Sequence, residues 1–79
     1  SRIQGQVMSL FSKYGPMTDE ELLERYVATY GHIYKNSLEP RRYELVRAGA
    51  LCKSAIRRQG KSGVRRIVWA PLAERALTT

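Results

Sequence analysis

Cysteine and histidine are the scarcest reactive residues in this chain of 79 residues, which contains one of each, Cys52 and His32. A single cysteine can form neither a disulfide within the chain nor a thiolate metal cluster. We therefore expect no metal and no other cofactor, and a reducing, intracellular setting. An inert, buried thiol is the simplest role for Cys52.

Long apolar runs are missing as well. No stretch approaches the roughly 20 apolar residues that a helix needs to cross a bilayer, and no signal peptide precedes the first helical pattern. We expect no membrane partner and a location in the cytoplasm.

Patterns of catalysis are also absent. His32 follows the end of a predicted helix, where solvent or a backbone carbonyl would be its partner. The carboxylates Glu20, Glu21 and Glu24 lie at a predicted helix start, where capping accounts for them. There is no phosphate-binding glycine loop, no pair of metal ligands and no nucleophile with a suitably spaced base. We predict no catalytic residue and no enzymatic activity.

Acidic residues are scarce in the second part of the chain. Residues 1–34 contain three basic and four acidic residues, for a charge of −1, whereas residues 35–79 contain eleven and three, for +8; the net charge is +7. Such a field attracts polyanions because basic side chains neutralise phosphates and release their counterions. Nucleic acid is the partner class that this charge favours, although an anionic membrane or an acidic protein would also respond to it.

A chain of this length can enclose one small hydrophobic core. We expect a single domain over residues 1–79, with its core within about 3–70 and a C-terminal tail or short helix over 71–79. An amphipathic repeat predicts a first helix from Ile3 to Tyr14. Thr18 and Glu21 form the capping box of a second helix, which Gly31 is predicted to end in the left-handed αL conformation.

A third helix is predicted over residues 37–48, with Ser37 as its N-cap and Pro40 in its first turn, where proline is tolerated. At 100° per residue, one side of this helix faces the core and the other faces solvent. The inward residues are Leu38, Arg42, Leu45 and Val46. The outward residues are Pro40, Tyr43, Glu44 and Arg47.

Two short β-branched or aromatic runs, over residues 51–53 and 65–70, predict an antiparallel hairpin with a long polar tip that contains Gly60 and Gly63. Residues 53–66 contain six basic residues and no acidic one. These six are Lys53, Arg57, Arg58, Lys61, Arg65 and Arg66. Across all elements, the residues predicted to share one core are Leu10, Phe11, Leu22, Leu45, Val46, Ile67 and Trp69.

Three segments of the chain resemble the small winged helix-turn-helix proteins of bacteria and their phages. They are Thr18–Leu22, Pro40–Leu51, which fits the pattern RRxELxxAGxx, and Ser62–Ala70, which fits SGxRxxxW. Pro40 departs from the flexible small or polar residue that many of these proteins carry. The resemblance covers about residues 3–70 and implies an α+β, mostly α fold, in which three helices are followed by a hairpin wing. It also implies a role in DNA handling, in the cytoplasm or nucleoid of a bacterium or in a phage host.

The third helix and the wing are the two elements that this fold offers to duplex DNA. The residues predicted to contact DNA are Ser37, Arg41, Tyr43, Glu44, Arg47, Lys53, Arg57, Arg58, Lys61, Arg65 and Arg66. Each has a simpler alternative: Tyr43 and Arg47 can form a solvated helix face, and the wing cations can serve solubility. We expect Arg42 to pair with Glu20, Glu21 or Glu24, and Trp69 to pack in the core rather than stack on bases.

Three functions are compatible with the sequence. The first is sequence-selective binding to double-stranded DNA by a transcriptional regulator, with the third helix in the major groove. The second is a winged helix that docks on a protein, such as a polymerase or a larger assembly, through an aromatic surface made by Tyr14, Tyr26, Tyr30 and Tyr34. The third is binding to nucleic acid without sequence preference. A homodimer is compatible with each of them.

Overall fold

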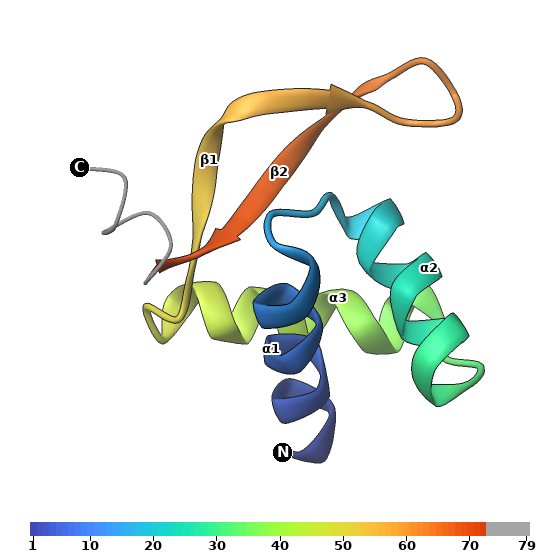
Figure 1. Ribbon diagram of the computed structural model, residues 1–79, viewed down its shortest axis with the longest axis vertical. Coiled ribbons are helices and arrows are strands. Elements are labelled where there is room, and N and C mark those ends of the chain that lie inside the picture. Colours follow the sequence, from blue (N-terminus) through green and yellow to red (C-terminus); the bar gives the residue numbers. More distant parts are fainter. Residues whose placement is uncertain (73–79) are drawn as a thin grey trace.

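The computed structural model describes residues 1–72 as three helices followed by a two-stranded antiparallel hairpin (Figure 1). The helices are α1 (Arg2–Tyr14), α2 (Asp19–Tyr30) and α3 (Lys35–Arg47), and the strands are β1 (Leu51–Gln59) and β2 (Arg65–Pro71). This arrangement confirms the predicted α+β fold. The predicted tail falls largely on residues 73–79, which lie outside the described part of the chain.

The second helix begins as its sequence predicts. The Thr18 side chain accepts a hydrogen bond from the Glu21 backbone N–H, and the Glu21 carboxylate accepts one from the Thr18 N–H, at 3.1 and 2.9 Å. Its end differs from the prediction, because Gly31 combines a positive φ of 104° with an extended ψ of −176°. This conformation needs glycine but is not αL, and it leads the chain away from α2 into the connector of residues 31–34 before α3.

The third helix begins three residues earlier than predicted. Tyr34 is its N-cap and makes no side-chain capping bond, so the prediction of Ser37 as N-cap is wrong; Ser37 lies in the first turn, where its N–H bonds to the Tyr34 carbonyl. Pro40 consequently falls inside the helix, past the first turn. A proline has no N–H, so the Asn36 carbonyl four residues back has no helical donor. Asn36 is exposed, and water can serve this carbonyl instead.

The hairpin is longer than predicted. β1 continues to Gln59, and its residues Arg57, Arg58 and Gln59 pair with Ile67, Arg66 and Arg65. A shift of register between Lys53 and Arg57 marks a bulge. Strand propensity predicted too short a β1, because the hydrogen bonds between paired strands join backbone groups and do not require apolar side chains. Met17 also pairs with β2, since it forms an isolated antiparallel bridge with Trp69 through backbone hydrogen bonds of 2.9 and 2.8 Å.

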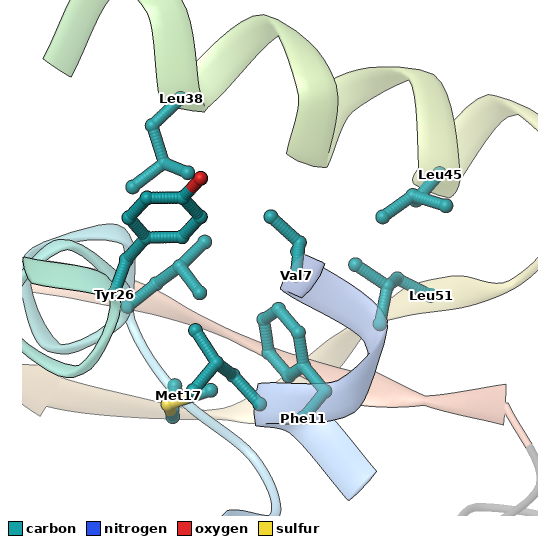
Figure 2. Packing of buried hydrophobic residues seen from close by; sticks show 9 residues of the cluster. Val7, Phe11, Met17, Tyr26, Leu38, Leu45 and Leu51 are labelled. Carbon is teal, nitrogen blue, oxygen red and sulfur yellow. The ribbon is translucent and has the colours of Figure 1, made fainter. Parts of the chain in front are cut away.

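The core lies between the three helices and the base of the hairpin (Figure 2). Leu10, Phe11, Leu22 and Leu45 are buried there as predicted. Further core members are Val7, Met17, Tyr26, Leu38 and Leu51. Val46 and Trp69 pack only at its margin. The prediction that Ile67 is a core residue is wrong, because β2 alternates in the opposite phase and buries Val68 and Ala70.

Candidate nucleic-acid interface

One stripe along α3 faces solvent over the whole length of the helix. Asn36, Pro40, Tyr43 and Arg47 are all exposed and follow one another at spacings of three or four residues. The Tyr43 side chain is 52% exposed, and the Arg47 guanidinium lies 5.9 Å from the centre of its ring. An aromatic ring and a cation therefore stand side by side on the outer surface. Ser37 is exposed beside the stripe, in the first turn.

Arg41 and Glu44 do not belong to this stripe, although both were predicted to contact DNA from α3. Both are half-buried, and their side chains pair at 3.1 Å. Glu44 also accepts a hydrogen bond of 2.6 Å from the Gln4 side chain, which ties the start of α1 to α3. The Nε of Arg41 is buried and has no hydrogen-bond partner in residues 1–72. This pair consequently faces α1.

Arg42 joins three elements. Its guanidinium donates two parallel bonds of 2.8 Å to the Asp19 carboxylate and lies 4.2 Å above the Trp69 ring. The predicted inward position is confirmed, whereas the predicted partners Glu20, Glu21 and Glu24 are wrong. Asp19 takes this place because it is the first residue of α2, at the end that meets both α3 and β2. The Arg42 contact also covers one face of Trp69.

The wing, which we define as residues 53–66, makes contacts with α2 that sequence reasoning missed. Nη1 of Arg58 lies 2.6 and 2.7 Å from the two carboxylate oxygens of Glu21, and the Lys61 ammonium lies 2.7 Å from Glu24. The backbone N–H of Lys61 donates to Glu20 at 3.1 Å. The signal was present in the sequence: four carboxylates over residues 19–24 exceed what a capping box requires.

These contacts shift the pKa values of Glu21 and Lys61. Burial alone would raise the pKa of Glu21. The Arg58 guanidinium and the hydrogen bonds at Thr18 lower it by more than burial raises it, so that the pKa lies below the ordinary value of 4.5. The pKa of Lys61 is raised, chiefly by its hydrogen bond to Glu24. Both shifts favour the charged, paired form.

The remaining wing cations are available to an external anion. Lys53, Arg57, Arg65 and Arg66 are exposed, and none lies within ion-pair distance of a carboxylate in the described part of the chain. Among residues 1–72, the Arg57 guanidinium donates to the carbonyls of Ser54 and Ile56. Within residues 1–72 there is no group of three potential metal ligands and no helix long and apolar enough to cross a membrane.

Two adjoining hollows connect the wing to α3. The first is lined by residues of α2, of β2 and of the start of α3, among them the basic residues Lys35, Arg65 and Arg66 and the acidic residues Asp19 and Glu20. The second follows the outer stripe and is lined by Asn36, Pro40 and Tyr43. Glu39 and Arg42 line both. The stripe and the inner edge of the wing, which Arg65 and Arg66 form, therefore border one continuous surface.

The predicted aromatic surface is smaller than the sequence indicated. Tyr14, Tyr30 and Tyr34 are 37%, 41% and 72% exposed. Tyr26 is buried, and its hydroxyl donates to the Gln6 side chain. Arg25 covers the Tyr14 ring at 4.1 Å from its centre.

Comparison with known proteins shows a likeness in structure alone. No known protein family matches the chain, and no curated protein matches its sequence. A crystal structure from Thermoplasma acidophilum, described as a putative transcriptional regulator, superposes with a TM-score of 0.67 over 96% of this chain and 80% of that one. The two sequences are 18% identical. The chain thus has a winged-helix-like fold of three helices and a wing, similar to that of this archaeal protein.

Proposed function

We propose that the protein binds double-stranded DNA with sequence preference and acts as a transcriptional regulator. The observation that carries this proposal is the continuous surface formed by the outer stripe of α3 and the inner edge of the wing. A helix fits the major groove, and a basic loop beside it can follow the adjacent backbone or minor groove. The fold shared with the archaeal protein supports the proposal through its arrangement of the same two elements.

The outer stripe is the sequence-reading part in this proposal. Arg47 can pair bidentately with guanine, Asn36 with adenine, and the Tyr43 ring can contact a thymine methyl group. Arg41 and Glu44 have a smaller part than the sequence indicated, because they pair with each other and Glu44 also accepts a hydrogen bond from Gln4 of α1. Lys53, Arg57, Arg65 and Arg66 supply the contacts to phosphates, which position the protein without reading sequence.

The test is a selection of binding sites from random duplexes with wild type, Arg47→Ala and Tyr43→Ala. Thr29→Ala, on the exposed side of α2, is the control. Wild type and Thr29→Ala should enrich the same motif, and each stripe variant should lose preference at one position, by roughly 1 to 3 kcal/mol of discrimination. Folding of each variant is checked first by circular dichroism. Equal enrichment by all four proteins would exclude α3 as the reading element, and absence of any motif would favour binding without sequence preference.

A further inference from the structure

The tip of the wing rests on the start of α2 in the free protein. Figure 1 shows the hairpin arching over the helices with its tip beside α2, and three polar contacts join them: Arg58 to Glu21, Lys61 to Glu24, and the Lys61 N–H to Glu20. The approach is close at Gly60 as well, where a Cβ would lie 2.8 Å from a carboxylate oxygen at the flexible end of the Glu20 side chain. Two of the six wing cations are thereby paired within the protein.

These pairs have the chemistry of a phosphate contact. A carboxylate presents two oxygens to a guanidinium or an ammonium much as a phosphate does. Nη1 of Arg58 already has both oxygens of Glu21 within 2.7 Å, so a phosphate cannot take the same place until Glu21 leaves. The carboxylates of Glu21 and Glu24 also oppose an approaching polyanion, because they lie at the point where the wing is closest to α2.

The contacts are nevertheless weak enough to exchange. The side chains of Arg58 and Glu21 are 47% and 35% exposed, and those of Lys61 and Glu24 are 78% and 52% exposed. Exposed ion pairs contribute little because water and salt screen them. Duplex DNA carries many closely spaced phosphates and gains from the release of its counterions, so it can compete for both cations together.

We propose that the start of α2 holds the wing closed in the free protein, and that DNA phosphates displace Glu21 and Glu24 from Arg58 and Lys61 on binding. The inference rests on the proposed function and adds a regulatory step to it. Lys53, Arg57 and Arg65 make the first contacts with DNA, and Arg58 and Lys61 join once the wing is released. The carboxylates of α2 therefore lower the affinity for every duplex in which the wing must open.

A cycle of variants tests this competition at fixed salt. The acid pair variant, Glu21→Gln with Glu24→Gln, removes the competitors and keeps the capping box, since glutamine can take the place of glutamate in it. The basic pair variant is Arg58→Met with Lys61→Met, and the fourth member combines all four changes. We expect the acid pair variant to bind a random duplex about tenfold more tightly than wild type. The combined variant should bind no more than about twofold more tightly than the basic pair variant.

Thr29→Lys is the control for charge alone, because it adds one positive charge on the exposed side of α2, at a position that takes no part in the contacts between α2 and the wing in the described residues. It should raise affinity by no more than about 1.4-fold, so that two such charge changes account for about twofold. The proposal would be overturned if the affinity gain of the acid pair variant is no larger than the gain expected from two such charge changes. It would also be overturned if the same affinity gain is found in the background that lacks Arg58 and Lys61. If none of the proteins, wild type included, binds duplex DNA, the proposed function itself fails.

Discussion

Arg42 connects three elements through its guanidinium group. Its bidentate bond to Asp19 and its position above Trp69 connect α3 to α2 and to β2, and its side chain is only 12% exposed. The planar fork of arginine suits both contacts, whereas a lysine could make one bond and no comparable stacking. Arg42, Asp19 and Trp69 therefore form a structural contact, which we call the clamp. It engages one of the cations that a charge count assigns to the basic second part of the chain.

Asp19→Asn should lower the free energy of unfolding by about 1 to 3 kcal/mol, because it leaves a partly buried guanidinium without its charged partner. Urea denaturation measures the change. Glu39→Gln removes an exposed pair of 4.0 Å and should change stability by less than about 0.5 kcal/mol. Equal effects of the two substitutions would show that the clamp contributes no more than a surface ion pair.

Glu21 should make stability depend on pH in a predictable direction. Its pKa is lowered in the folded protein, so its ionised form favours folding above the ordinary value of 4.5. This contribution is lost as the pH falls below 4.5 and through the lower folded pKa. Glu21→Gln keeps the cap but cannot titrate. The stability difference between wild type and this variant should therefore be largest near neutral pH and shrink on acidification, as thermal unfolding at several pH values would show. A stability difference between wild type and Glu21→Gln that does not change with pH would contradict this prediction.

At the scale of an element, α3 is unusual because it combines a proline in its interior with the absence of a side-chain N-cap. Leu38 and Leu45, both buried in the core cluster, hold the helix in place despite these local costs. Burial of large apolar side chains commonly outweighs the lost hydrogen bond of a proline. The start of the helix consequently depends on tertiary contacts more than its end does.

Pro40→Ala should restore the hydrogen bond to the Asn36 carbonyl and raise the free energy of unfolding by about 1 to 2 kcal/mol, after allowance for the more flexible unfolded chain. Tyr43→Ala, on the same exposed stripe, should stay within about 0.5 kcal/mol of wild type. Chemical denaturation compares the three proteins. A loss of stability in Pro40→Ala would indicate that the proline ring itself is needed at this position.

Periodicity predicted the helices well, because each buries one apolar face and the capping box of α2 is purely local. It failed where longer-range contacts decide the outcome. No local feature of the sequence indicates that β2 buries Val68 and Ala70 rather than Ile67 and Trp69, since the residues on both faces of the strand are apolar there. The pairing of Arg58 with Glu21 joins residues 37 positions apart, and a charge count shows only that both signs are present. The half-buried state of Arg41 and Glu44 likewise depends on where α1 packs.

At the scale of the whole molecule, the uneven charge of the chain is partly balanced within the fold. The acidic start of α2 meets the basic wing, so the surface left for an anion is narrower than the six wing cations imply. It consists mainly of Lys53, Arg57, Arg65 and Arg66, together with the outer stripe of α3. Salt dependence is the property that reports the number of cations engaged by DNA.

Arg57→Ala together with Arg65→Ala should weaken binding to all duplexes alike. It should also reduce the slope of log affinity against log salt by about 1.8, which is about 0.9 for each lost phosphate contact. Titration at several salt concentrations, with two unrelated duplexes, measures both effects. Loss of affinity for one duplex only would assign these residues to base recognition, and an unchanged slope would remove them from the interface.

The bridge between Met17 and Trp69 has a consequence for the order of events during synthesis. These residues are 52 positions apart, since 69 minus 17 is 52, yet they exchange two backbone hydrogen bonds and lie where the connector of α1 and α2 meets β2. The helices can form and begin to collapse while the chain is still growing, because their contacts are nearer in sequence. Closure of the fold must wait until Trp69 has left the ribosome, so folding to the native state finishes only after this part of the hairpin is made.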